Sequence, residues 1–284
     1  MTSPQLRIAV IGHVEYVVIA RVPALPQPGE ILHLDEPLWI PGGGGGITFA
    51  QLAKSPAELH LFTAFGEDDA AEAARERVEQ TGAIVHAARR AAPQTRDVVL
   101  LTPNGERTIV VVGRPLHATL DDALDWSILD GCRAVFFSAE DPRLLHRARA
   151  VEILVVTARR QKAVAGSGIA PDVIVGSAFD PLEASTLADY AVPPKALVMT
   201  EGAAGGRIET AAGVTRFAAP SSPPMTGAAY GAGDSFVGAL TWFMACGFSV
   251  EEACVRAGPY GAAVLRGINP LENQLSLETR QPLL

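Results

Sequence analysis

The chain has 284 residues, of which 48% are apolar and 19% charged, and its formal net charge is −8. This composition is that of a globular protein with a large core, and it excludes a disordered chain. The acidic balance argues against nucleic-acid binding, which depends on clustered Lys and Arg side chains that neutralise phosphates.

The amino-terminal part of the chain predicts a strand, an irregular segment and a helix. Residues 6–11 form a short apolar run that ends at Gly12, as expected for a strand buried on both faces. The next segment, 13–38, is interrupted by prolines and predicts short strands and turns. Five glycines at 42–46 then predict a loop that opens a helix over 47–53.

A strand, a helix and a hairpin are expected next. Residues 58–65 predict a strand, and residues 70–80 predict a helix. The runs 98–101 and 108–112 flank Asn104-Gly105, and Asn-Gly between two β-rich runs is a strong hairpin signal.

The second half of the chain alternates regularly. Apolar runs separated by helix-length intervals predict βαβ units and a parallel sheet. Segments 13–38 and 95–113 break this rhythm, and we expect them to pair as a small β-sheet beside the main one. No linker divides the chain, and so we expect a single domain over 1–284. The apolar runs lie at 134–137, 153–156, 173–175 and 197–199.

The segment 230–240 carries the chemistry. Gly231, Ala232 and Gly233 precede an apolar run at 236–245 that predicts a buried helix, so their backbone N–H groups would form an anion site at its amino terminus. Asp234 in the first turn could then accept the proton of a substrate hydroxyl. The pattern taken alone leaves two interpretations open, a catalytic carboxylate or a helix cap beside a glycine turn.

This segment resembles the carboxy-terminal signature of the ribokinase-like (PfkB) family of carbohydrate and nucleoside kinases. Its Gly-Ala-Gly-Asp-Ser-Phe matches the family core, and further motifs follow the family order along the chain. They are the glycine-rich stretch 42–53, the strand and Gly-x-Asp of 62–68, the lid strand 105–109, and Thr200-Glu201-Gly202 with Gly205.

The resemblance implies an α/β/α sandwich with a mainly parallel sheet, and a β-lid at 13–38 and 95–113 that often forms a dimer interface in relatives. It implies ATP as phosphoryl donor, with Mg²⁺ bound to the nucleotide, and Asp234 as general base beside the anion hole of residues 231–233. Further positions that match the family pattern are Gly43 and Gly44 near the substrate, and Thr200, Gly202, Gly205 and Gly261 near the nucleotide.

Several family positions are altered. Ala228, Ala229 and Tyr230 replace Asp-Thr-[Thr/Val], which puts the monovalent-cation loop of many relatives in doubt. The Asn-x-x-Glu motif that orders the metal is reduced to Asp180, which has either a metal-related role or a place in a solvated loop. Glu183, three residues on, is a substitute.

The substrate end is altered as well. Val17 stands where relatives have an Asp that holds sugar hydroxyls, and Glu15 shares its face if the chain is extended. Glu15 therefore either takes over that role or is a charge at the lid edge. The Asn of the glycine-rich signature falls at Ile47 or, after a slip of one residue, at Thr48, which we assign to substrate binding. His13 faces the cleft or is structural.

Other residues bear on location and on the carboxy-terminal part. Three widely spaced cysteines without a Cys-x-x-Cys pair predict neither a disulfide framework nor a zinc site. No apolar run approaches about 18 residues, and no signal-like segment is present; we expect a cytoplasmic protein without a membrane span.

Pro259 is expected to interrupt a helix from Glu251, and the pair Arg159-Arg160 to be a solvated face.

We therefore expect a small-molecule kinase. An alternative on the same scaffold is a ligand-binding or regulatory protein with weak or no turnover, which the altered positions favour. A nucleotide-binding oxidoreductase is disfavoured because a single Gly12, and not Gly-x-Gly-x-x-Gly, follows the first strand. A P-loop enzyme is excluded because no Gly-x-x-x-x-Gly-Lys-[Ser/Thr] occurs.

Overall fold

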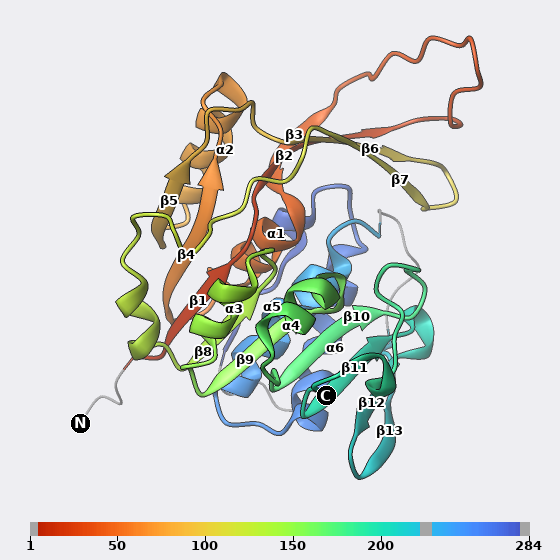
Figure 1. Ribbon diagram of the computed structural model, residues 1–284. Helices are drawn as coiled ribbons and strands as arrows, with labels where there is room; N and C mark the ends of the chain where they lie inside the picture. The colour runs from red at the N-terminus through yellow and green to blue at the C-terminus, as the bar shows by residue number, and fades with distance from the viewer. Residues whose placement is uncertain (1–4, 222–228, 279–284) are drawn as a thin grey trace.

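The computed structural model describes residues 5–221 and 229–278. Its main element is a nine-stranded sheet that is parallel except at one edge, where β12 and β13 run antiparallel (Figure 1). From edge to edge the strands are β13 (Gly213–Phe217), β12 (Gly206–Thr210), β11 (Ala196–Thr200), β10 (Val173–Ser177), β9 (Ile153–Thr157), β8 (Ala134–Phe137), β1 (Arg7–Ile11), β4 (Glu58–Phe65) and β5 (Ile84–Arg89).

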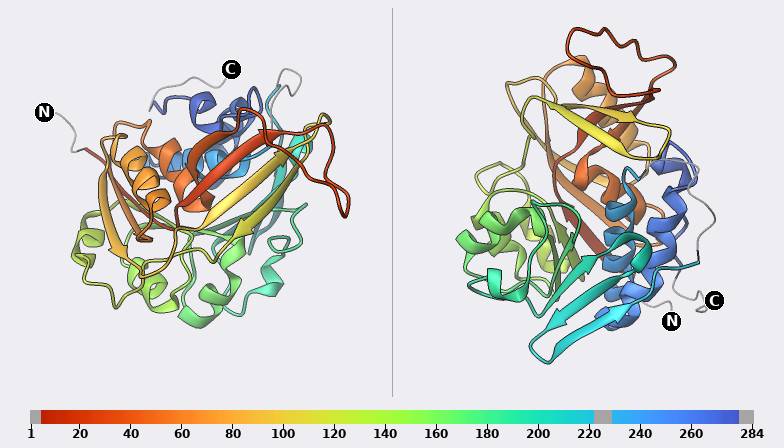
Figure 2. Two further views of the ribbon diagram at one scale, coloured as in Figure 1. Left: turned by 90° about the horizontal axis from the view of Figure 1, so that it is seen from above. Right: turned by 90° about the vertical axis from the view of Figure 1, so that its right-hand side faces the viewer.

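Side chains of the central strands alternate between two cores, as expected for a sheet buried on both faces. In β1, Val10 packs into one core and Ile11 into the other. Helices cover both faces and complete three layers (Figure 2). One face holds α1 (Gly43–Leu52), α2 (Asp69–Glu79), α5 (Ala232–Ala245) and α6 (Val250–Val264), and the other holds α3 (Pro142–Ala148) and α4 (Gln161–Ser167).

A separate four-stranded sheet, called the lid sheet below, stands at the upper right of Figure 1. Its strand order is β3 (Leu38–Gly42), β2 (Glu15–Arg21), β6 (Arg96–Leu101) and β7 (Arg107–Val112). The inner face packs Val17, Val99 and Leu101 against Ile47 of α1 and against Tyr230. The small sheet expected from segments 13–38 and 95–113 is thus present. The first of these segments continues past residue 38, because β3 runs to Gly42.

Two local predictions were wrong. The glycines at 43–46 form the first turn of α1 and are not a loop. Glycine is needed there because a Cβ on Gly45 would lie 2.5 Å from the His13 carbonyl oxygen, so α1 packs directly on the chain that follows β1. Pro259 does not interrupt its helix either, since α6 continues through it to Val264. Burial of α6 against α5 overrides the local preference of proline.

The remaining ordered elements are short. They are the 3₁₀ turns η1 (Trp126–Gly131), η2 (Ala158–Arg160), η3 (Leu187–Asp189) and η4 (Gly202–Ala204), and the helix α7 (Pro270–Asn273). Within residues 5–221 and 229–278, no helix is both long and apolar enough to cross a bilayer.

Candidate active site

The amino terminus of α5 has the geometry of an anion site. Gly231 is the N-cap residue and has a φ of 79°, a left-handed conformation that suits glycine. No described side chain caps the helix, so its first N–H groups stay available for a ligand. A Cβ on Gly233 would meet no described atom within 4 Å, which leaves this turn open. The helix start predicted from the sequence is confirmed.

Asp234 lies in the first turn of α5 and is half-buried. Removal from solvent raises the pKa of Asp234 to about 7, and the carboxylate of Glu183 contributes in the same direction. Arg107 of the lid sheet and Arg159 of η2 act in the opposite direction. A carboxyl group with a pKa near neutrality is suited to accept a proton and release it again.

Gly43 and Gly44 bring the start of α1 beside this carboxylate. A Cβ on Gly44 would lie 3.4 Å from Asp234 Oδ1 and 3.8 Å from His13 Cε1. A Cβ on Gly43 would lie 3.0 Å from both Glu15 Oε2 and His13 Cδ2. The two glycines therefore keep side chains out of the space between Asp234, His13 and Glu15, where a substrate would need room.

Thr48 has a different place from the one the sequence suggested. Its side chain is fully buried, and its hydroxyl donates to the backbone oxygen of Asp234 at 3.2 Å. This contact holds α1 against α5. The geometry supports a positioning role and not a substrate contact, because a fully buried hydroxyl that is already bonded is not free to meet a ligand.

The inner face of the lid sheet carries two buried carboxyl groups. Asp97 on β6 is the cross-strand partner of Val17 on β2, and Glu15 lies two residues before Val17 on the same face. Burial raises the pKa of Glu15 to about 9, and its hydrogen bond with Asp97 and the charges of Asp97 and Asp234 add to the effect. A carboxylate is therefore present beside position 17, contributed by the neighbouring strand.

Tyr230 connects this pair to the start of α5. Its hydroxyl accepts a hydrogen bond from the Gly43 backbone N–H at 3.3 Å. Burial raises the pKa of Tyr230 well above its usual value, and Asp97 and Glu15 add to this, so the phenol stays neutral. Ala228, the first altered family position before Tyr230, lies outside the described residues.

Two histidines and a serine near Glu15 carry buried polar atoms. His13 and His117 meet edge to face with ring centroids 5.0 Å apart. Burial lowers the pKa of His13 well below its usual value and that of His117 to about 3, with Arg160 contributing to both, so both rings are neutral at neutral pH. His13 Nδ1, both ring nitrogens of His117 and Ser138 Oγ are buried without a hydrogen-bond partner among the described residues.

The turn expected near the nucleotide forms at the end of β11. Thr200 Oγ1 donates to the Gly176 carbonyl at 3.2 Å, which fixes the strand end. Gly202 and Gly205 both have positive φ, 57° and 87°. A Cβ on Gly205 would overlap the Phe217 carbonyl oxygen, so this glycine is required by the turn itself. Contact of Thr200, Gly202 and Gly205 with a nucleotide stays a prediction.

Gly261 is used for helix packing. It is buried in α6, and a Cβ there would lie 2.9 Å from the Ala232 carbonyl oxygen and 3.2 Å from Phe236 Cβ. The glycine thus lets α6 approach the start of α5 closely. This contact supports the anion site from behind and leaves Gly261 without an open side for the nucleotide contact that the sequence predicted.

Arg159 engages the residues expected near a metal. It pairs with Asp180 and, at 3.1 Å, with Glu183. Glu183 Oε2 also accepts from the Ser177 backbone N–H at 2.9 Å. Among the described residues no group of three or more His, Cys, Asp or Glu side chains is placed to hold a metal ion. Arg159 thus engages both carboxylates, and the metal-related role of Asp180 stays a prediction.

The sequence suggested a solvated face for the pair Arg159-Arg160. Arg159 is exposed, but the Arg160 side chain is only 11% exposed. Its Nε donates to the Ser138 carbonyl oxygen at 2.6 Å, and its Nη1 contacts Glu140 at 2.8 Å. Sequence reasoning also missed Asp97, His117 and Ser138. These residues share no sequence motif and no regular spacing. Asp97 lies in a lid strand, Ser138 follows the end of β8, and His117 lies between β7 and η1.

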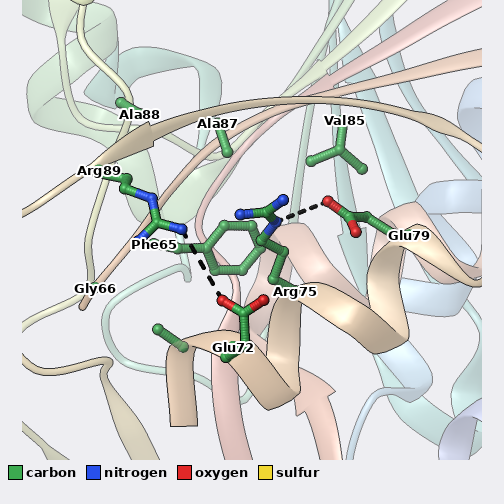
Figure 3. Close-up of a pocket in the computed structure, with 10 residues that line it drawn as sticks. Phe65, Gly66, Glu72, Arg75, Glu79, Val85, Ala87, Ala88 and Arg89 are labelled. Atoms are coloured by element: carbon green, nitrogen blue, oxygen red, sulfur yellow. Dashed lines mark hydrogen bonds and ion pairs between the residues drawn. The ribbon is translucent and has the colours of Figure 1, made fainter. Parts of the chain in front are cut away.

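A cavity of about 190 Å³ lies elsewhere, between α2 and the strands β4 and β5 (Figure 3). Arg75 pairs with Glu79 at 2.8 Å, and Arg89 lies 4.0 Å from Glu72. Each arginine on its wall thus has a carboxylate partner, and no contact there points to a ligand. The cavity belongs to the β5 edge of the sheet and not to the Asp234 site.

Comparison with solved structures establishes the fold. A ribokinase from Thermotoga maritima aligns with a TM-score of 0.75 and 18% identity, over 95% of this chain and 96% of that one. A ribokinase from Arabidopsis thaliana, solved with ribose and ATP, has a TM-score of 0.74, 16% identity and the same coverages of 95% and 96%. No protein-family model and no curated protein matches the chain.

A nucleoside kinase of the ribokinase family from Methanocaldococcus jannaschii is similar too, with a TM-score of 0.69 and 13% identity over 94% of each chain. The chain therefore has the ribokinase fold, as its motifs predicted. Its structural neighbours over nearly the full length are sugar and nucleoside kinases at low identity.

Proposed function

We propose that the chain is a divergent ribokinase-like (PfkB) kinase that transfers the γ-phosphoryl group of ATP to a hydroxyl of a sugar-like compound. The observation that carries the proposal is the position of Asp234, beside an uncapped helix amino terminus on one side and the Gly43–Gly44 space on the other. The proposed base therefore lies next to both the proposed anion site and the space proposed for the substrate.

In this mechanism the substrate hydroxyl oxygen forms a bond to the γ-phosphorus while the bond from that phosphorus to the bridging oxygen of ADP breaks. The hydroxyl proton passes to Asp234, and the N–H groups of residues 231–233 stabilise the charge on the transferred group. Arg107 and Arg159, which lie in electrostatic reach of Asp234, favour its ionised form.

ATP fits the residues present better than a protein-bound metal does. The open turn at Gly233 and the uncapped N–H groups of α5 suit a phosphate. Asp180 and Glu183 are already engaged by Arg159, so any Mg²⁺ is expected to arrive with the nucleotide phosphates. With Tyr230 at the altered family position, we expect no dependence on a monovalent cation.

The test is ATP-dependent phosphorylation across a panel of sugars, sugar phosphates and nucleosides. Asp234→Asn should lower kcat by at least about 10³-fold, because the acceptor of the hydroxyl proton is lost. Glu251→Gln is the matched control, since Glu251 is an exposed carboxylate in the first turn of α6. It should leave kcat unchanged. Full activity of Asp234→Asn, with its thermal unfolding unchanged, would refute the assignment.

A second candidate is a ligand-binding or regulatory protein on the same scaffold. Arg159 favours it, because it occupies both carboxylates near the altered metal motif. Binding of ATP and a sugar without phosphate transfer to any compound of the panel would support this candidate over the kinase.

We also propose a homodimer formed through the lid sheet. The outer strand β7 has one unpaired edge, and Val110, Val111 and Val112 are each about half exposed, at 51%, 49% and 51%. Such an apolar edge strand is rarely left uncovered. Val110→Glu should convert a dimer into a monomer in light-scattering measurements, and a monomeric parent chain would refute the proposal.

The compartment follows from the chemistry proposed. Cys132, Cys246 and Cys254 are unpaired, as in proteins of a reducing compartment, which is also where ATP is available. On this ground we place the kinase in the cytoplasm, with ATP and a small sugar-like compound as its partners.

A further inference from the structure

The acid pair Glu15–Asp97 is incompletely satisfied. Glu15 is 5% exposed and Asp97 3% exposed, and the two carboxyl groups share a hydrogen bond. Asp97 Oδ1 has no hydrogen-bond partner among the described residues. A buried carboxylate oxygen left without a donor is unfavourable, because its lost hydration is not replaced. The pair thus retains a buried acceptor without a donor among the described residues.

The surrounding protein groups do not neutralise this pair. His13 Nε2 lies 3.7 Å from Glu15 Oε1, but the ring is buried and held neutral. Arg160 bonds the Ser138 carbonyl oxygen and Glu140, and its charge lowers the pKa of Glu15 by less than burial and Asp97 raise it. Asp234 adds further negative charge from the other side. The inner face of the lid sheet is therefore acidic and excludes a phosphate or carboxylate group.

A ligand ammonium group matches this environment better than a hydroxyl does. A hydroxyl donates one hydrogen bond and leaves the pair with its shared proton. An ammonium donates three hydrogen bonds and brings a positive charge, so it can bridge both carboxyl groups while Glu15 releases its proton. The two neutral imidazoles of His13 and His117, and Ser138 Oγ, remain to bind hydroxyl groups.

The spacing to Asp234 fits one small molecule. Gly43 borders Glu15 and Gly44 borders Asp234, and consecutive Cα atoms are about 3.8 Å apart. The acid pair and Asp234 thus border adjacent residues at the start of α1, so that one small molecule in this space can contact both. We propose that the substrate is an amino-substituted sugar or cyclitol, whose ammonium group binds between Glu15 and Asp97 while one of its hydroxyls faces Asp234; this inference rests on the proposed kinase function.

The first test compares matched substrates with the unmodified protein. Glucosamine against glucose, galactosamine against galactose and an aminocyclitol against inositol differ by one amino group. At least one amino compound should be phosphorylated with a kcat/KM at least about 30-fold above its neutral counterpart. Equal or better use of the neutral member of the preferred pair would overturn the inference while leaving the kinase function intact.

Variants then assign the preference to the acid pair. Asp97→Asn should lower kcat/KM for the amino compound by at least about 30-fold and for its neutral counterpart by less than about threefold. Glu106→Gln, an exposed carboxyl change at the tip of the lid hairpin, is the control and should change neither. Equal losses for both compounds in Asp97→Asn would show a structural role and sink the proposal.

Direct binding separates this inference from the kinase proposal. Titration calorimetry of the amino compound at pH 7.5, in two buffers of different ionisation enthalpy, should reveal proton release in the parent protein and none in Glu15→Gln. Glu15 faces Asp97, Asp234, His13, Arg160 and Tyr230, and Glu15 is the member of this set expected to lose its proton on binding. Binding of the amino compound with proton release but without turnover would uphold the amine subsite and refute the kinase function. Binding of neutral sugars alone, or of no compound, would overturn the amine subsite.

Discussion

The two ends of the candidate site are built in opposite ways. At the phosphoryl end, one continuous segment supplies Gly231, Gly233 and Asp234 on the first turn of α5. At the lid end, the polar groups come from the chain after β1, from β2 and β6, from the loop before η1 and from the end of β8. In the proposed kinase, a short local unit carries the chemistry, whereas the residues proposed for substrate recognition come from distant segments that can change one by one.

The two ends also differ in charge balance. Arginines from the lid sheet and η2 oppose the raised pKa of Asp234. At the lid end, Arg160 also opposes the raised pKa of Glu15, but burial and Asp97 outweigh it and the pKa stays at about 9. The pKa of Asp97 is raised mainly by burial. This difference agrees with the two proposals, a nucleotide and a proton at the phosphoryl end and a positively charged ligand at the lid end.

Among the tests of these two ends, Gly233→Ala should have the largest effect, because it alters the first turn of α5 at the phosphoryl end. A methyl group there would point into the open turn, so kcat/KM for ATP should fall by roughly 100-fold. Stability should stay equal or rise, because Ala favours a helix over Gly by about 1 kcal/mol. Steady-state kinetics and thermal unfolding check both outcomes.

Gly231→Ala is the contrasting control, because it should instead lower the melting temperature. Its φ is positive, and its Cβ would lie 3.0 Å from Pro270 Cβ. If Gly233→Ala keeps normal use of ATP, the anion site is not at this turn.

The pH dependence of kcat tests the phosphoryl end next. Asp234 must be ionised to accept the proton, and its pKa is about 7. The rate should therefore rise with pH, by roughly tenfold between pH 6 and pH 8. A profile of kcat for the preferred substrate measures this limb, and a flat profile across that range would contradict a base with this pKa.

Stability against pH tests the lid end. A carboxyl group whose pKa is raised in the folded state binds its proton more tightly there than in the unfolded chain. Its contribution therefore weakens as pH rises from about 4.5, the unfolded value, towards 9. Glu15→Gln should remove this loss and be more stable than the parent by about 1–3 kcal/mol at pH 8.5, with little difference at pH 5.

Urea unfolding at pH 5 and pH 8.5 measures this difference, with Glu106→Gln as the exposed control. A Glu15→Gln chain that is less stable than the parent at pH 8.5 would show that the ionised carboxylate, and not the proton, is what the folded lid prefers.

The smallest expected effect concerns the influence of the Arg159 charge on the pKa of Asp234. Arg159 lowers the pKa of Asp234, so Arg159→Gln should shift the acidic limb of the kcat profile upward by about 0.3–1 unit. Arg75→Gln, which breaks an ion pair at the separate cavity of Figure 3, should not shift it. A downward shift in Arg159→Gln would mean that the proton acceptor is a different group.

The fold could be predicted from the sequence where local pattern decides structure. Apolar runs marked the central parallel strands, and glycines before an apolar run marked α5. The edge strands β5, β12 and β13 were missed, because they are half-exposed and lack such runs. The helical glycines of α1 were missed for another reason: the close approach of the chain after β1, and not local preference, decides their conformation.

The candidate site divides in the same way. Asp234 could be proposed from the sequence because its whole motif is contiguous. Asp97 could not be found from pattern, since its relation to Glu15 depends on the register of two strands about 80 residues apart in sequence. Thr48 and Gly261 were assigned by motif to ligands but serve helix packing, which depends on the contacts between α1, α5 and α6.

The register of β2 against β6, which places Asp97 opposite Val17, has a consequence for how divergent enzymes are recognised. A functional group can migrate from one chain position to another while staying nearly fixed in space, provided that the two positions are neighbours across a sheet. An alignment column then records a loss, although the folded molecule has none. Before a divergent enzyme is declared inactive, the residues on the neighbouring strand, opposite each altered position, should therefore be examined.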